Sequence, residues 1–152
     1  MDKHDRQILR LLQQSSTLPN HELAAAVGLS TSPCHRRVKA LEDSGVVSDY
    51  RALVNRAAVG YGFLAFAMVT LDRQTSDCVA AFETAMLQRE EVLEAHLVSG
   101  DFDFLLKVVA ADMDDFQRFI MTFLAKLPEV TKIRTLLPMR SAKETTICPV
   151  RD

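Results

Sequence analysis

The chain has 152 residues, a length that fits one domain or two small ones. Apolar residues make up 48% and charged residues 25%, as in ordinary folded soluble proteins, and the formal net charge is −2. This balance excludes a protein that coats nucleic acid through charge alone, although a net charge hides local patches.

The cysteines and the start of the chain indicate a reducing compartment. Cys34, Cys78 and Cys148 are odd in number and scattered, so they form neither a disulfide framework nor a CxxC zinc pair. The histidines also lack metal-ligand spacing, and we expect no metal and no cofactor. The chain opens without an apolar signal-peptide core, and no apolar run approaches the ~20 residues of a membrane span. We therefore expect a cytoplasmic protein without membrane contact.

Two helices are expected near the N-terminus. Asp2 or Asp5 can cap the first, after which apolar residues recur at helical spacing. Asn20 can cap the second, over residues 21–27, and Gly28 fits the position just after it, where a positive φ is common.

A third helix is expected after a tight Gly-Leu-Ser turn. Ser30 suits its N-cap and Gly45 its end. Cys34, Val38 and Leu41 give this helix one apolar stripe. Two short helices joined by a tight turn, with the second helix basic on its outer face, are typical of a helix-turn-helix.

The basic face of the third helix carries the candidates for binding double-stranded DNA. Recognition helices present such a face to the major groove. Arg36 can donate two hydrogen bonds to a guanine, while Lys39 or Arg37 can hold phosphates. A merely solvated basic face is the alternative, but the preceding helix, turn and cap favour DNA. The candidate residues are Ser32, His35, Arg36, Arg37 and Lys39.

The rest of the chain has a different periodicity. Residues 46–55 are expected to be extended, and residues 56–62, which contain two glycines, are expected to be a connector. Beyond them, aromatic and β-branched runs predict strands, and apolar residues at helical spacing predict helices. The expected strands cover residues 63–71, 92–99, 104–110 and 130–139, and the expected helices cover residues 77–88 and a segment capped by Asp112.

The order β-α-β-β-α-β is that of the ferredoxin-like fold, a four-stranded antiparallel sheet with both helices on one face. The predicted fold class is α+β. Successive apolar residues within the strands, as in 104–106, predict burial on both faces of the sheet. A second copy of the chain is the simplest cover for the face without helices, so we expect a homodimer.

Several short motifs, in order and over nearly the whole chain, carry a resemblance to a known family. In them the chain resembles the leucine-responsive/asparagine (Lrp/AsnC) family of transcription regulators. The motifs are residues 5–9, 23–30, 33–42, 45–47 and 96–106.

The resemblance implies a winged helix-turn-helix over residues 1–50, a linker over 51–62 and a ferredoxin-like effector-binding and oligomerisation domain over 63–152. It implies a bacterial, nucleoid-associated regulator that binds specific DNA sequences. It also implies dimers that join into octamers or related assemblies. The implied effector is an amino acid or a related small molecule, bound between dimers near the hairpin of the second and third strands.

Five residues are candidates for holding that effector. Exposed backbone N–H groups of a hairpin can bind a carboxylate, and an acidic side chain can bind an ammonium group; an α-amino acid carries both. By the residues alone, Gly100-Asp101 is better interpreted as an ordinary tight hairpin turn, and the resemblance favours the ligand role. The candidates are Ser99, Gly100, Asp101, Asp103 and Thr135.

Two other functions remain as alternatives. The first is an architectural DNA-binding protein that condenses or wraps DNA with little response to a ligand, because the same basic helix serves both. The second is an enzyme of amino-acid metabolism, since ferredoxin-like modules also occur as regulatory parts of enzymes. No catalytic constellation supports an enzyme, and about 150 residues leave no room for a further catalytic domain. We therefore expect no enzymatic activity.

Overall fold

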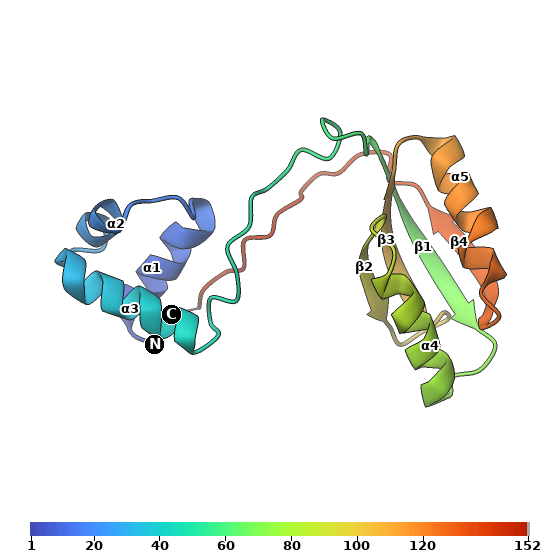
Figure 1. Ribbon diagram of the computed structural model, residues 1–152, viewed down its shortest axis with the longest axis horizontal. Coiled ribbons are helices and arrows are strands. Elements are labelled where there is room, and N and C mark those ends of the chain that lie inside the picture. Colours follow the sequence, from blue (N-terminus) through green and yellow to red (C-terminus); the bar gives the residue numbers. More distant parts are fainter. Residues whose placement is uncertain (152) are drawn as a thin grey trace. The chain divides into compact units, whose positions relative to one another are not determined.

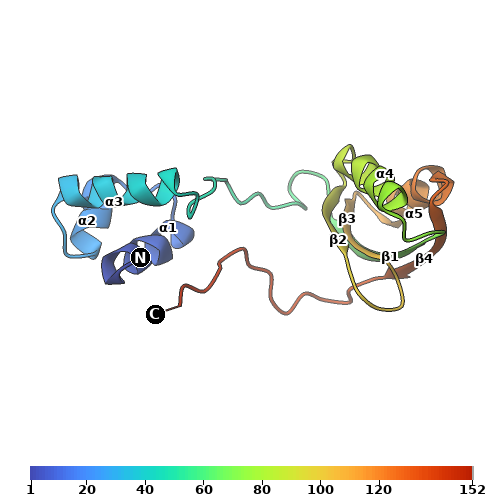
Figure 2. The ribbon, with the colours of Figure 1, turned by 90° about the horizontal axis from the view of Figure 1, so that it is seen from below.

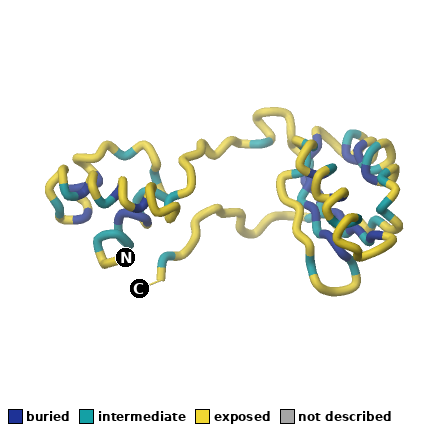
Figure 3. Tube along the Cα trace, turned by 60° about the horizontal axis from the view of Figure 1, so that its bottom comes forward, coloured by how far each residue is buried: buried dark blue, intermediate teal, exposed yellow. Residues whose placement is uncertain are grey.

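The computed structural model describes residues 1–151 and divides the chain into two compact units (Figure 1). The first unit comprises Met1–Leu53 together with the C-terminal segment that starts at Lys143, and the second comprises Val54–Ala142. Each unit has its own apolar core, and the backbone that connects them is exposed (Figure 3). The segment that starts at Lys143, predicted to belong to the second domain, therefore packs with the first.

The first unit contains three helices, α1 (Lys3–Gln14), α2 (Asn20–Ala26) and α3 (Thr31–Asp43). Asp2 is the N-cap of α1, and its side chain accepts hydrogen bonds from the N–H groups of His4 and Asp5. The Asp5 carboxylate in turn accepts the Asp2 N–H at 2.8 Å, which completes a capping box. Both predicted capping residues thus act at the same helix end.

The predicted cap of α2 is wrong. Pro19 occupies the N-cap position, and its carbonyl accepts the N–H groups of Glu22 and Leu23 at 3.0 Å each. Asn20 is instead the first helical residue, because the fixed φ of proline already sets the extended entry to the helix. Ser30 lies at the N-cap of α3 as predicted, although its side chain makes no capping hydrogen bond.

The turn between α2 and α3 depends on Gly28. Its φ is +71°, and its N–H donates to the Ala25 carbonyl at 3.2 Å. The next N–H, of Leu29, donates to the Ala24 carbonyl at 2.9 Å, which makes this helix end a Schellman motif. The turn directs α3 across α2 and buries the predicted stripe of α3. The core of this unit consists of Ile8, Leu9, Leu23, Ala24, Val27, Cys34, Val38 and Leu41.

The implied wing is not formed by strands in this structure. Within residues 1–151, no strand precedes residue 63, and residues 46–55 are extended or bent without a pairing partner. The predicted connector at 56–62 contains a turn.

The second unit has the predicted ferredoxin-like order of elements. Its strands form one antiparallel sheet in the order β2-β3-β1-β4. Strands β1 and β3 have the predicted bounds, whereas β2 and β4 end before the predicted residues. The elements are β1 (Phe63–Leu71), α4 (Ser76–Leu87), β2 (Val92–Leu97), β3 (Phe104–Ala110), α5 (Met113–Thr122), a short 3-10 helix at Leu124–Lys126 and β4 (Val130–Leu136).

Helices α4 and α5 cover the same face of the sheet (Figure 2). Alternate residues of β1, such as Ala65 and Val69, point into this core and are fully buried. The rings of Phe82 from α4 and Phe104 from β3 lie 4.6 Å apart at its centre. The predicted arrangement of helices on one side is therefore confirmed.

The opposite face of the sheet has no helix over it among the described residues (Figure 2). The middle of this face is apolar: it carries Phe66 and Met68 of β1 and Leu105 of β3. All three side chains are only half buried there. Charged residues flank this strip; Lys107 Nζ lies 2.9 Å from the Glu94 carboxylate on the β2 side.

The predicted tight turn at Gly100-Asp101 is also wrong. Residues 98–103 connect β2 to β3 as a longer loop, closed by a hydrogen bond of 2.9 Å from the Val98 N–H to the Asp103 carbonyl. The Val98–Asp103 hydrogen bond continues the β2–β3 register by one residue, and Asp103 also contacts β1: its N–H donates to the Val69 carbonyl at 2.9 Å.

Candidate nucleic-acid interface and ligand pocket

The exposed face of α3 carries four of the five predicted DNA-binding residues. Ser32, His35, Arg36 and Lys39 are all exposed, opposite the buried stripe of Cys34 and Val38. In the described part of the chain, neither the Arg36 nor the Lys39 side chain has a hydrogen bond or an ion pair. Their positive charges are therefore available to an external anion.

His35 is partly engaged within the unit. Its Nδ1 lies 3.2 Å from the Asn20 side-chain nitrogen, a contact that joins the start of α2 to the start of α3. Both side chains are exposed, so the pair lies on the surface of the unit. A DNA contact by His35 would involve the start of α2 as well.

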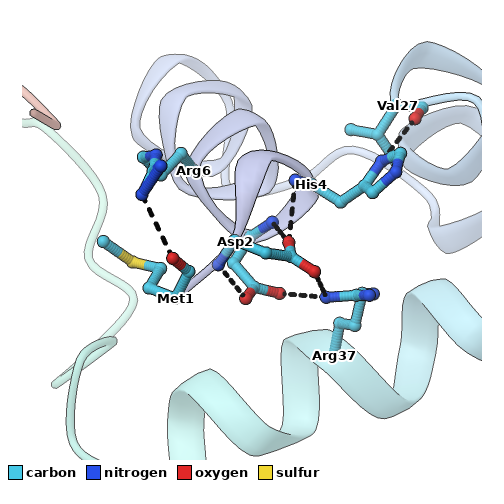
Figure 4. A network of polar contacts seen from close by, with 7 residues as sticks. Met1, Asp2, His4, Arg6, Val27 and Arg37 are labelled. Carbon is cyan, nitrogen blue, oxygen red and sulfur yellow. Dashed lines mark hydrogen bonds and ion pairs between the residues drawn. The ribbon is translucent and has the colours of Figure 1, made fainter. Parts of the chain in front are cut away.

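Arg37 differs from its neighbours because it holds α3 against α1. One of its guanidinium nitrogens lies 2.7 Å from both the Asp2 and the Asp5 carboxylates, which also form the capping box of α1 (Figure 4). Two acids on one cation leave little positive charge for a phosphate. Arg37 therefore positions the recognition helix through these ion pairs, and its phosphate contact stays a prediction.

The protonation of this cluster follows from its contacts. A hydrogen bond from the Asp5 backbone N–H, together with the Arg37 guanidinium, lowers the pKa of Asp2 from 3.8 to about 2. Hydrogen bonds to Asp5 and Asp2 raise the pKa of Arg37. Asp2 and Arg37 are therefore both charged near neutral pH. The same helix end is held from another side, where His4 Nδ1 lies 3.1 Å from the Val27 carbonyl (Figure 4).

The predicted effector residue Asp103 has a structural place instead. It is 4% exposed, and one of its carboxylate oxygens accepts the Leu71 N–H at 2.7 Å. The other oxygen accepts a hydrogen bond from the Gln74 side-chain amide. Both oxygens are thus used inside the chain, where Asp103 fixes the 98–103 loop to the end of β1; its contact with a ligand stays a prediction.

A pocket does lie beside that loop, on the sheet face without helices. Its volume is about 120 Å³. Arg134 pairs with Met68, and Lys132 pairs with Thr70, in the register of β4 and β1, which places all four side chains on one face. Two residues of the 98–103 loop, Asp101 and Phe102, line the pocket. The lining residues are Met68, Thr70, Asp101, Phe102, Lys132 and Arg134.

The charges around this pocket suit a zwitterion. Arg134 and Lys132 are exposed cations, and Asp101 is an exposed anion; in residues 1–151 none of the three side chains has a hydrogen bond or an ion pair. A guanidinium can bind a carboxylate with two parallel hydrogen bonds, and a carboxylate can accept from an ammonium group. Met68 and Phe102 supply an apolar contact for the remainder of a small molecule.

The structure brings together only some of the predicted effector residues. Ser99 and Gly100 are exposed in the loop, and Gly100 has a φ of +139°, where a side chain would be strained. Thr135 lies on the other face of the sheet, because its register partner is the core residue Ala67. Of the five candidates, Asp101 alone lines the pocket.

The two cations of β4 were not among the residues predicted from the sequence. Lys132 and Arg134 are two residues apart in a predicted strand, and this spacing already placed them on one face. Their proximity to Asp101 had no local signal, because it depends on the pairing of β4 with β1.

The described residues contain no cluster of three or more His, Cys, Asp or Glu that could hold a metal ion. Among residues 1–151, no helix combines the length and apolar character required to span a membrane.

Comparison with known proteins agrees with both halves of the structure. Residues 1–48 match the winged helix-turn-helix DNA-binding family, and residues 64–148 match the Lrp/AsnC ligand binding domain. The chain is 42% identical over 144 residues to a leucine-responsive regulatory protein of Rhizobium meliloti, covering 95% of this chain and 92% of that protein. It is 40% identical over 145 residues to the protein of the same name from Escherichia coli K12, covering 95% of this chain and 88% of that protein.

Solved structures give the same result. A transcriptional regulator from Neisseria meningitidis, crystallised as a complex with L-Met, matches with a TM-score of 0.94 and 36% identity over 98% of this chain and 96% of that one. An AsnC family transcriptional regulator from Agrobacterium tumefaciens matches with a TM-score of 0.93 and 35% identity over 98% and 97% of the two chains. With its helix-turn-helix and its ligand-binding domain, the chain belongs to the Lrp/AsnC family of DNA-binding transcriptional regulators.

Proposed function

We propose that this regulator binds a roughly two-fold symmetric DNA site as a dimer or an assembly of dimers, and that an α-amino acid in the pocket beside residues 98–103 controls that binding. The observation that carries the proposal is the pocket itself, where two unpaired cations and one unpaired acid converge around an apolar patch. We place the protein at the nucleoid in the cytoplasm of a bacterium.

The orientation of the ligand follows from the charges. Arg134 and Lys132 hold the carboxylate, and Asp101 accepts hydrogen bonds from the ammonium group. Met68 and Phe102 then contact the side chain, which favours an apolar amino acid over a charged one. Support for this class comes from the similar Neisseria regulator, whose crystal structure contains L-Met.

A second copy of the chain would serve both parts of the proposal, because it would complete the pocket and cover the sheet face without helices. The pocket, at about 120 Å³, is smaller than the ~300–1,000 Å³ of typical small-molecule sites, so a partner can complete it. The half-buried Phe66, Met68 and Leu105 on the same face give that partner an apolar surface. Ligand contacts with two copies would change the relative stability of alternative assemblies, and thereby DNA binding.

A thermal-shift screen of the twenty amino acids tests the ligand. The expected result is a concentration-dependent increase in Tm with apolar amino acids, because a ligand that binds only the folded state stabilises it. Arg134→Ala should abolish the shift, while Lys126→Ala, which removes a cation outside the pocket, should leave it intact. No shift with any amino acid would favour the architectural alternative, a DNA-binding protein without a ligand response.

DNA titrations test the recognition helix. Arg36→Ala should weaken binding to the specific site by about 1–3 kcal/mol if Arg36 contacts a base. Lys39→Ala should weaken binding to all sequences alike and reduce the salt dependence by about one unit for each lost phosphate contact in each subunit. Unchanged affinity of both variants for specific and random DNA would show that another face binds.

Footprinting and light scattering test the assembly. We expect at least a dimer at micromolar concentration, protecting half-sites about one helical turn, or a multiple of it, apart. A monomer in solution, or a single isolated half-site, would contradict the proposal.

A further inference from the structure

The C-terminal segment is bound to α1 by its backbone. The Gln13 side chain pairs with both backbone groups of Cys148: its Oε1 accepts the Cys148 N–H at 2.7 Å, and its Nε2 donates to the Cys148 carbonyl at 3.0 Å. One turn earlier in α1, the Arg10 guanidinium donates to the Val150 carbonyl at 3.0 Å. The Val150 side chain is half buried against the helix-turn-helix core.

The spacing of these residues explains why the segment fits. Arg10 and Gln13 are three residues apart in α1 and therefore share one face of that helix. Cys148 and Val150 are two residues apart in an extended segment, so their carbonyls point to the same side. The opposite face of α1, with Ile8 and Leu9, is buried in the core, which leaves this polar face for the segment.

Because backbone groups make these hydrogen bonds, the contact depends on Gln13 more than on the side chain of Cys148. The contact is also weakly held. Exposed hydrogen bonds contribute net free energies that are similar in size to the entropic cost of fixing the few backbone residues that make them. It can therefore open and close without unfolding either unit.

We propose that residues 147–150 form a releasable strap, which gives the DNA-binding unit a second tether to the ligand-binding domain. The chain passes from the first unit to the second near Leu53, and returns to the first unit near Lys143. With the strap bound to α1, both passages limit how far the two units can move apart. When the strap opens, the 54–62 passage alone connects the units, and the DNA-binding unit reaches a wider range of positions.

A bound strap should therefore make DNA binding sensitive to the spacing of half-sites. This consequence rests on the proposed binding of paired half-sites, whereas the strap itself is measurable without DNA. The variants are Gln13→Ala in the full-length protein, deletion of residues 147–152, and Gln14→Ala as a matched control on an exposed neighbour in α1.

Hydrogen exchange of the free protein tests the strap directly. The Cys148 amide should exchange at least about twofold faster in Gln13→Ala than in the wild type, because its acceptor is lost, and Gln14→Ala should not differ from the wild type. Equal exchange of the Cys148 amide in the wild type and Gln13→Ala would overturn the strap.

DNA titrations then test its consequence. The wild type should discriminate between the best half-site spacing and one with about five added base pairs, which rotates one half-site by half a turn. Gln13→Ala and the deletion should each reduce that ratio of affinities by at least about threefold. An unchanged ratio in both variants would refute the claim that the bound strap makes DNA binding sensitive to half-site spacing. A wild type that does not discriminate would instead refute the proposed paired half-sites, and the exchange result would still decide the strap.

Discussion

Replacing Asp103 tests whether the 98–103 loop is held by its own carboxylate. In Asp103→Ala, the buried Leu71 N–H loses its side-chain acceptor, which lies at 2.7 Å, and Gln74 loses a charged acceptor. An unsatisfied buried donor costs about 1–3 kcal/mol. The Gln74 amide is partly exposed and can bind water, so we assign its loss about 1 kcal/mol. The expected destabilisation is therefore about 2–4 kcal/mol.

Amide exchange at Leu71 measures this change where it occurs. A loss of about 2–4 kcal/mol corresponds to a roughly 30- to 700-fold faster exchange of the Leu71 amide, if exchange follows opening of the loop. Asp103→Asn keeps one acceptor oxygen and should lose about 1 kcal/mol. Asp101→Asn, an exposed neighbour in the same loop, should stay within about 0.5 kcal/mol of the wild type.

Two results would refute the structural role of Asp103. The first is exchange at Leu71 in Asp103→Ala that stays within about threefold of the wild type, since this would mean that the carboxylate does not hold the loop. The second is an Asp103→Asn variant with normal Leu71 exchange that no longer binds the amino acid found by the screen. Normal Leu71 exchange together with lost ligand binding in Asp103→Asn would place Asp103 in the ligand site.

Three further perturbations address the two cores and the α1–α3 contact. Gly28→Ala should cost about 1–2 kcal/mol from backbone strain alone, because φ is +71° and no atom lies within 4 Å of an added Cβ; an unchanged urea midpoint would contradict this. Phe82→Ala removes a side chain with 0% exposure and should destabilise the second unit by about 3–5 kcal/mol in denaturant unfolding, and a loss below about 1 kcal/mol would be inconsistent with its burial. Because the pKa of Asp2 is lowered in the folded state, its contribution is complete above the unfolded value of 3.8 and is lost as the pH falls towards about 2. Acid titration of the first unit should show this loss in the wild type and not in Asp2→Asn.

Local patterns in the sequence determined most of the secondary structure. The stripe of α3 was predictable because Cys34, Val38 and Leu41 recur at helical spacing, and all three are buried. The bounds of β1 and β3 followed from continuous apolar runs, which only central strands of a sheet require. The Gly28 turn was predictable because a positive φ favours glycine whatever surrounds it.

The site depended on contacts that no local pattern contains. Arg37 belongs to the basic segment of the sequence, yet its acid partners come from α1, and only the packing of α1 against α3 brings them within 2.7 Å. Asp103 resembled a ligand residue because an exposed turn and a buried loop anchor have the same residue types. Only the pairing of β4 with β1 places Lys132 and Arg134 beside Asp101.

The sequence by itself thus determined the elements, the family and the exposed basic helix, because helical and strand periodicity act over a few residues. Tertiary structure decided which charged side chains remain available. A charge is available only if no oppositely charged group folds against it, and its partners are distant in the sequence. For the same reason, the sequence did not assign the C-terminal segment to α1, whose contacts with Cys148 and Val150 join opposite ends of the chain.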